Sequence, residues 1–155
     1  MRTTTTIINS PVGPLTLTER DGALVRLLFG AHGPCDPPTP LLRRATGQLN
    51  EYFAGVRREF DLPLEPSGTE FQLACWRGLT EIPDGQTRSY GEQAARIGRP
   101  DRARAVGAAN GANPIAIIQP CHRVIGADGS LVGFGGGLET KRRLLDLEAG
   151  ILSLV

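Results

Sequence analysis

Long apolar runs are missing from this 155-residue sequence, and cysteines and histidines are few. The longest apolar runs, such as residues 115–118, are far too short to cross a bilayer, and no positively charged start leads into an apolar signal segment. We therefore expect a soluble, cytoplasmic protein with no membrane among its partners. The 40% hydrophobic content is enough for one ordinary domain or two small ones.

Metal-binding patterns are also scarce. The three cysteines form no C-x-x-C pair, and only two histidines are present, which disfavours a zinc site and leads us to expect no metal. An odd number of cysteines in an unexported protein fits a reducing compartment, where a free thiol persists. We interpret Cys35 as a loop thiol and Cys75 as a small core residue, which leaves Cys121 as the candidate for chemistry.

A strong positive charge, the usual mark of a nucleic-acid-binding domain, is absent, because the net charge is only +1. The total conceals a local excess, since residues 86–104 hold five arginines against two acids. The planar guanidinium of arginine is suited to phosphate. Because an excess of Arg over Lys also accompanies GC-rich genomes, the cluster is more informative than the overall composition.

The first part of the chain predicts a small α+β domain. Short β-branched or apolar runs predict an antiparallel meander over residues 3–8, 15–19 and 23–29. Apolar residues at helical spacing predict a helix over 41–54, and a further strand is expected near 60–64. Pro66-Ser67-Gly68 is the expected linker. We therefore expect two domains, residues 1–66 and residues 67–155.

The second part predicts mainly helices, over residues 70–80, 90–97, 102–110 and 138–149. The two short helices on either side of Gly98-Arg99-Pro100 resemble a helix-turn-helix. The Asp128-Gly129 pair is a hairpin-turn signal and predicts paired strands at 124–125 and 131–134.

The last helix carries a carboxylate on its apolar stripe. Leu138, Leu144 and Leu145 form the stripe, and Glu148 follows at i+4 from Leu144 and i+3 from Leu145. A buried carboxylate needs a partner. A frayed helix end in solvent would explain Glu148 equally well.

Pro120-Cys121-His122 places a thiol beside an imidazole. A cysteine is a poor nucleophile until it becomes a thiolate, and a nearby histidine is a common device for lowering its pKa. Adjacent residues point to opposite faces of a strand and lie roughly 100° apart around a helix, so this pair needs irregular backbone or a bridging water. Pro120 favours irregular backbone. By itself, the dipeptide also fits a buried thiol beside an unrelated histidine.

Six pieces of sequence follow one another between Phe71 and Gly150. They are Phe71-Gln72 with Trp76, residues 87–91, residues 104–107, residues 110–114, residues 120–125, and residues 135–138 with Lys141. In this order they resemble the O6-alkylguanine-DNA alkyltransferases, also called methylated-DNA–protein-cysteine methyltransferases. Residues 10–15 and 49–55 resemble that family's N-terminal domain. The resemblance implies a ribonuclease-H-like α+β N-terminal domain, followed by a mostly helical C-terminal domain with a winged helix-turn-helix.

The resemblance also implies a single-turnover DNA repair protein that needs no cofactor. Cys121 would attack the alkyl carbon on O6 of guanine, or on O4 of thymine, and keep the group as a thioether. His122 would deprotonate the thiol through a water, and Glu148 would orient the imidazole, as nucleophile, base and orienting group. Asn113 would brace the active-site segment, although Asn and Gly ahead of a proline also form plain turns.

The implied partner is double-stranded DNA with alkylated bases. We expect a monomer, and the sequence leaves open whether several copies bind cooperatively along the DNA. The target nucleotide must leave the duplex, and Arg104 would take its place in the stack. A polyalanine helix in a core would explain the small residues around Arg104, but not Arg104 itself. Tyr90 would push on the target's 3′ phosphate, although packing alone could explain a lone tyrosine. Thr87, Ser89 and Arg99 would add contacts to the DNA backbone.

Phe134 and the three glycines that follow match the loop that closes over the alkylated base, where the alternative is a flexible connector. The chain departs from many relatives here, because Phe134 replaces a tyrosine and Gln119 an apolar residue. Gly135 and Ala116 are small where some relatives carry larger residues, so we expect a roomier base pocket that accepts bulkier alkyl groups. Arg123 belongs to the matched motif, but the sequence assigns it no role.

Other classes of protein remain as alternatives. A non-catalytic lesion-binding relative would share the DNA surface, but such proteins lack the reactive cysteine. A regulatory helix-turn-helix protein would bind undamaged DNA in a sequence-specific way. A general cysteine hydrolase would need an oxyanion hole, and the sequence shows no motif for one.

Overall fold

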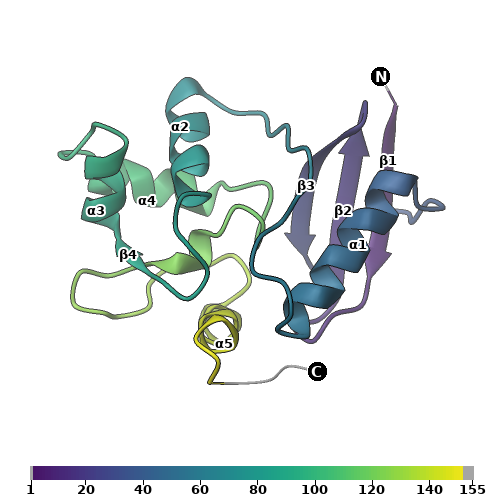
Figure 1. The fold of residues 1–155 in the computed structure, drawn as a ribbon. Helices are drawn as coiled ribbons and strands as arrows, with labels where there is room; N and C mark the ends of the chain where they lie inside the picture. The colour runs from purple at the N-terminus through teal and green to yellow at the C-terminus, as the bar shows by residue number, and fades with distance from the viewer. Residues whose placement is uncertain (1, 152–155) are drawn as a thin grey trace.

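The computed structural model describes residues 2–151 and shows a three-stranded sheet with one helix beside a group of four helices (Figure 1). This mixed architecture confirms the expected α+β class. Among the described residues, no helix is long and apolar enough to cross a membrane. Within the same range, no group of three His, Cys, Asp or Glu side chains is placed to hold a metal ion.

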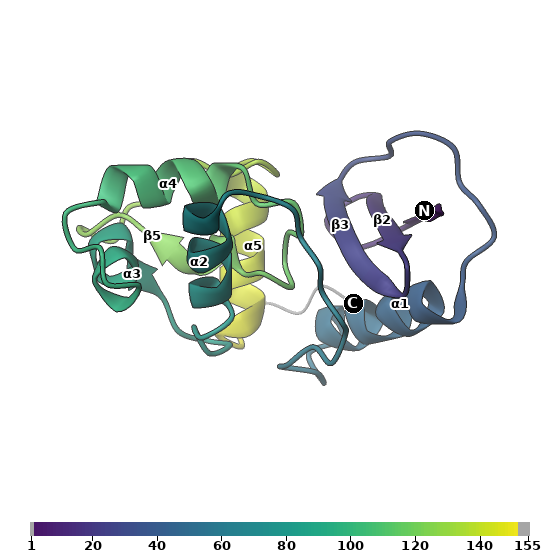
Figure 2. The ribbon, with the colours of Figure 1, turned by 90° about the horizontal axis from the view of Figure 1, so that it is seen from above.

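The sheet is the antiparallel meander that the sequence predicts. It consists of β1 (Thr3–Ile8), β2 (Leu15–Arg20) and β3 (Ala23–Phe29), in that order. Helix α1 (Pro40–Phe53) packs along it and buries Leu42, Ala45 and Leu49 (Figure 2). Thr39 caps the helix, because its hydroxyl accepts the N–H of Leu42, and Pro40 fills the first turn, where a missing N–H costs nothing.

The strand expected near residues 60–64 is wrong. Leu64 forms only a single bridge with Leu24, and the neighbouring Pro63 has no N–H with which to extend a ladder. Pro63 still contributes its carbonyl, which accepts the N–H of Leu24 at 2.8 Å. The segment therefore covers part of the β3 edge without becoming a strand.

The rest of the β3 edge is paired with a segment from far along the chain. Leu27 donates its N–H to the carbonyl of Pro114 at 2.9 Å, and its own carbonyl accepts the N–H of Ala116 at 3.0 Å. Ile115 and the three residues that follow it are buried in the same core as the sheet and α1. The chain that leads to Cys121 is thus anchored on the N-terminal sheet.

Three helices follow the linker, namely α2 (Glu70–Leu79), α3 (Tyr90–Arg96) and α4 (Ala103–Gly111). Thr69 and Ser89 begin α2 and α3 with complete capping boxes. Gln93 of α3 and Asn110 of α4 exchange two buried amide hydrogen bonds, of 3.1 and 2.8 Å. This pairing fixes the two helices of the expected helix-turn-helix against each other.

Of the hairpin expected around Asp128-Gly129, the turn forms, but the predicted pairing of its two strands is wrong. Val124–Ile125 (β5) pairs in parallel with Arg88–Ser89 (β4), and residues 131–134 form no strand. In this segment the backbone carbonyl of Val132 is bound by side chains rather than by a neighbouring strand. It accepts hydrogen bonds from Lys141 at 2.9 Å and from Tyr90 at 3.3 Å. The turn itself forms, with the N–H of Gly126 donated to the carbonyl of Ser130.

The last helix, α5 (Leu138–Glu148), buries only part of the stripe that the sequence predicts. Leu138 is 49% exposed, because it stands at the first position of the helix, beyond the packed surface. Leu144 and Glu148 are buried as expected, and Leu145 is half-buried. Lys141 is fully buried one turn before Leu144, where its ammonium donates to the carbonyls of Val124 and Val132.

Candidate active site

Two γ-turns give the chain its irregular path into the Cys-His dipeptide. In the first turn, Ile117 has a φ of 69°, and the N–H of Ile118 donates to the carbonyl of Ala116 at 2.7 Å. This is the strained form of the γ-turn. Pro120, with φ −81° and ψ 69°, is spanned by a hydrogen bond from the N–H of Cys121, which makes the relaxed form. A positive φ at a β-branched residue costs about 1–3 kcal/mol, and such strain clusters at functional sites.

After the second turn, residues 121–123 form a single 3-10 turn. This backbone separates the two neighbours, since His122 is fully buried while Cys121 is partly exposed. The irregular structure that the dipeptide required is therefore present.

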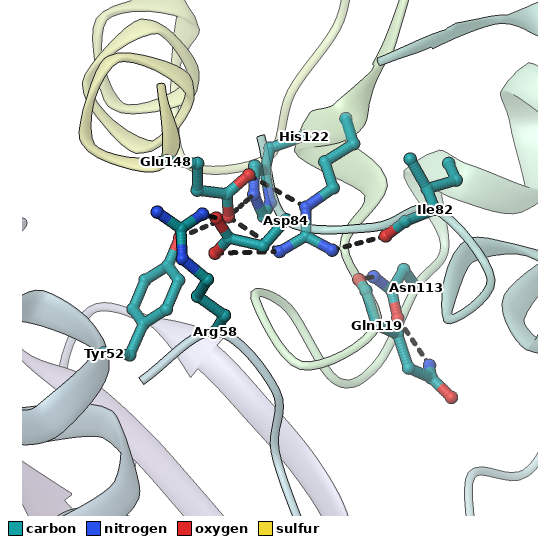
Figure 3. Close-up of polar contacts among 9 residues, drawn as sticks. Tyr52, Arg58, Ile82, Asp84, Asn113, Gln119, His122 and Glu148 are labelled. Atoms are coloured by element: carbon teal, nitrogen blue, oxygen red, sulfur yellow. Dashed lines mark hydrogen bonds and ion pairs between the residues drawn. The ribbon is translucent and has the colours of Figure 1, made fainter. Parts of the chain in front are cut away.

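Glu148 gathers three side chains at its carboxylate (Figure 3). His122 Nε2 lies 2.7 Å from Oε2, and the Arg123 guanidinium donates to both oxygens, at 2.8 and 2.9 Å. The Tyr52 hydroxyl donates to Oε2 at 2.6 Å. Glu148 is only 5% exposed, so the alternative of a frayed helix end in solvent is wrong.

The charge on Glu148 sets the tautomer of His122. Burial alone would raise the pKa of the Glu148 carboxyl, but His122 and Arg123 outweigh it and hold that pKa at about 2. An ionised carboxylate can only accept, so His122 Nε2 carries the proton and Nδ1 is left as the basic nitrogen. Nδ1 is buried and has no hydrogen-bond partner among the described residues.

The thiol of Cys121 is held by Asn113. The Asn113 Nδ2 donates to Sγ at 3.3 Å and to the carbonyl of Gln119 at 2.8 Å. Its Oδ1 accepts the N–H of Ile115 at 3.1 Å and the Gln119 side-chain amide at 2.8 Å. The amide of Asn113 is therefore fixed from both ends, which a plain turn would not require.

Burial raises the pKa of the Cys121 thiol, and the hydrogen bond from Asn113 and the charge of Lys141 act against that rise. Because burial outweighs the other effects, the thiol keeps its proton at neutral pH. It needs a base to become a nucleophile.

Two cavities reach Cys121 and share Phe134 and Gly135 in their walls. The first, of about 310 Å³, is also lined by Tyr90, and the second, of about 400 Å³, by Ala116. The structure thus brings the expected base-pocket residues together with the thiol. The Phe134 ring packs edge-on against Phe29 of β3 at 5.4 Å between centroids, so the N-terminal sheet also supports the pocket.

The residues expected to meet DNA lie around α3 and α4. Thr87, Arg99 and Arg104 are exposed, whereas the core-facing side of α4 is formed by Val106 and Ala109. A helix packed wholly in a core is therefore the wrong interpretation of α4. Ser89 uses its hydroxyl oxygen to accept the N–H of Glu92 as a helix cap, which leaves its proton available for donation.

Comparison with known proteins supports this fold and identifies the family. The family described as "6-O-methylguanine DNA methyltransferase, DNA binding domain" matches residues 70–150, and the family's "ribonuclease-like domain" matches residues 3–66. The structure is similar to that of Mycobacterium tuberculosis OGT in complex with DNA, with a TM-score of 0.88 and 51% identity, covering 95% of this chain and 93% of that one. These matches define a ribonuclease-like domain joined to a DNA-binding domain.

Curated relatives match this chain over most of their own length. A methylated-DNA–protein-cysteine methyltransferase from Mycobacterium bovis is 53% identical over 91% of this chain and 89% of that protein. One from Methanosarcina acetivorans is 48% identical over 92% of this chain and 96% of that protein. The chain belongs to the 6-O-methylguanine DNA methyltransferase family, whose curated members carry the name methylated-DNA–protein-cysteine methyltransferase.

Three residues of the site have no role in the sequence-based prediction. Arg123 neutralises Glu148, Gln119 holds Asn113, and Tyr52 reaches Glu148 from the other half of the chain. Gln119 was visible as a polar residue among apolar ones. No local pattern marks Tyr52, which occupies an ordinary buried position on α1.

Gln119→Val is expected to slow alkyl transfer by about 2–10-fold, because one neutral hydrogen bond to Asn113 is lost. The measurement is the rate constant for transfer from a methylated duplex at saturating DNA. Gln119→Glu is the matched control, because it keeps the size of the side chain but replaces the donor with an acceptor facing Asn113 Oδ1. It should be slower than Gln119→Val. Wild-type rates in both variants would show that Gln119 does not hold Asn113.

Proposed function

We propose that this protein repairs DNA by moving a methyl or small alkyl group from O6 of guanine in a duplex to Sγ of its own Cys121. The observation that carries the proposal is a single thiol at two cavities, held by Asn113 and backed by the buried His122–Glu148 pair. Membership of the family supports the reaction, and the M. tuberculosis relative in complex with DNA supports the partner.

In this reaction, His122 Nδ1 takes the proton of the thiol, through a water, and Glu148 stabilises the resulting imidazolium. The thiolate attacks the alkyl carbon, the C–S bond forms, and the C–O bond to guanine breaks. The electron pair stays with the base, and Tyr90, which lines the same cavity as Cys121, would donate a proton to it. A thioether is not hydrolysed, so each molecule acts once. The same displacement applies to O4 of thymine.

The alkylated base reaches the thiol only outside the duplex. Arg104, exposed on α4, would fill the vacated place in the stack, while Thr87, Ser89, Arg99 and Tyr90 would contact the DNA backbone. Phe134, Gly135 and Ala116 would enclose the flipped base. We propose that a monomer does this work in the cytoplasm.

The two parts of the chain would then divide the work. Residues 67–155 would bind DNA and carry the nucleophile, and residues 1–66 would form the supporting domain. The family matches at residues 3–66 and 70–150 support a division at the linker. A regulatory or non-catalytic binding role is not favoured, because neither needs a thiol backed by a base and a carboxylate.

Intact-mass analysis tests the proposal. After incubation with a duplex that contains one O6-methylguanine, the protein should gain one methyl group and no more, however long the incubation. The matched control is the same duplex with unmodified guanine, which should leave the mass unchanged. A protein that stays unmodified, or that releases methanol with repeated turnover, would refute the proposed reaction.

A further inference from the structure

Tyr52 joins the N-terminal half of the molecule to the buried pair behind the thiol. It belongs to α1, which packs on the sheet, whereas Glu148 stands at the end of α5. Its hydroxyl donates to Glu148 Oε2 at 2.6 Å although 96 positions separate the two residues, and the Tyr52 side chain is 1% exposed. Figure 3 shows Tyr52 approaching the carboxylate from the side opposite to Ile82.

The oxygen that Tyr52 binds is the one that faces His122. Oε2 also meets His122 Nε2 at 2.7 Å and accepts a hydrogen bond from Arg123 at 2.9 Å, while Oε1 is bound by Arg123 alone among residues 2–151. Burial, and then the Glu148 carboxylate, raise the pKa of Tyr52 well above its usual value, so the phenol keeps its proton and remains a donor. Tyr52 and Arg123 together therefore fix the position of the acceptor on which the imidazole depends, and Tyr52 makes the shorter of the two hydrogen bonds.

A second connection between the two halves leads to the Arg123–Glu148 ion pair. Arg58, which follows α1, pairs with Asp84 at 2.9 Å, and Asp84 lies 3.7 Å from the Arg123 guanidinium that holds Glu148. Arg58 is largely exposed, so this connection is weaker than the buried one through Tyr52. Tyr52 thus contacts Glu148 directly, whereas Arg58 reaches it only through Asp84 and Arg123.

We propose that Tyr52 is a positioning residue for alkyl transfer. By holding Glu148 Oε2, it keeps the His122 ring oriented with Nε2 on the carboxylate and Nδ1 free to act as the base. The N-terminal domain then takes part in the chemistry without touching DNA or the alkyl group. The role in transfer rests on the proposed function, whereas the effect on the His122 ring does not.

Tyr52→Phe removes the hydroxyl and leaves the ring, which packs against Phe53 and Phe60 at 5.2 and 5.5 Å between centroids. At saturating methylated duplex, its transfer rate constant should fall roughly tenfold, the effect of one lost hydrogen bond to a charged group. The dissociation constant for DNA should be unchanged, because Tyr52 is buried away from the DNA-facing helices. In a Glu148→Gln background, Tyr52→Phe should have little further effect.

Phe53→Leu is the matched control. It disturbs the same aromatic packing, but Phe53 has no polar side-chain atom with which to hold Glu148 or His122, so the variant should lower the melting temperature and leave the transfer rate unchanged. An equal loss of rate in Phe53→Leu, or a wild-type rate in Tyr52→Phe, would overturn the proposal.

A measurement on the free protein separates this proposal from the proposed function. The chain has only two histidines, so a sample labelled with ¹⁵N-histidine reports on both rings by NMR. In Tyr52→Phe, the Nε2–H of His122 should exchange with solvent several-fold faster, whereas His32, which is bound to the Phe29 carbonyl, should not change. Unchanged exchange at His122 would refute the positioning role even if the wild-type protein takes up methyl groups. Faster exchange would support that role even if it does not.

Discussion

Cys121→Ala is expected to bind a methylated duplex and to take up no alkyl group from it. The other two thiols cannot replace Cys121, because Cys75 is fully buried under the helices and Cys35 lies on an exposed loop near β1. Neither lines the cavities around Phe134. The loss should be complete rather than partial, because the thiol is the atom that receives the group. Intact mass gives the uptake, and fluorescence anisotropy with labelled duplex gives the affinity.

Cys121→Ser is the control for this variant, since it keeps a polar atom near Asn113 Nδ2 but is a far weaker nucleophile. It should bind the duplex like Cys121→Ala and should likewise show no transfer. A methyl group found on Cys35 or Cys75 in either variant would contradict the assignment of Cys121.

Glu148→Ala is expected to lower the free energy of unfolding by about 3–5 kcal/mol, as breaking a buried ion pair does. The variant leaves the Arg123 guanidinium, which is 6% exposed, without its main partner, and it leaves His122 and Tyr52 without an acceptor. Urea unfolding at neutral pH measures the loss. Glu148→Gln keeps the shape and one oxygen, so it should lose less.

The dependence of the free energy of unfolding on acidic pH provides a second test of Glu148. The pKa of Glu148 is about 2 in the folded protein, against 4.5 for an unperturbed glutamate, so its ionised form stabilises the fold above pH 4.5. That contribution, about 3 kcal/mol, is lost as the pH falls from 4.5 to 2. Glu148→Gln should lack this part of the decline, and the difference between the two proteins removes the effect of the other carboxyls. If the free energies of unfolding of the wild-type protein and of Glu148→Gln fell in parallel from about pH 5 to pH 2, a low pKa at Glu148 would be contradicted.

Local pattern was enough for much of the fold. Short β-branched or apolar runs between turn residues predicted the three strands, and apolar residues at helical spacing predicted the helices. Local pattern failed where distant parts of the chain compete for the same backbone. Val124–Ile125 pairs with Arg88–Ser89 rather than with residues 131–134, and no turn signal could show that preference.

In the candidate active site, too, some residues could be predicted from the sequence and others could not. The order of the matched motifs predicted Cys121, His122, Glu148 and Asn113, and the structure brings these residues together. Tyr52 could not be predicted, because a buried tyrosine on an amphipathic helix has the same pattern whether or not its hydroxyl finds a distant carboxylate. Arg123 could not be interpreted for a related reason, since its role appears only when α5 is packed against the 3-10 turn.

The β3 edge has a consequence for how the chain acquires its structure. Leu27 receives its backbone partners from Pro114 and Ala116, so the first sheet to leave the ribosome lacks part of its pairing until residues 114–116 have been synthesised. The boundary at the linker is therefore a boundary in sequence rather than in cooperativity. The N-terminal sheet therefore completes its native hydrogen bonding only once the segment that leads to the thiol is present.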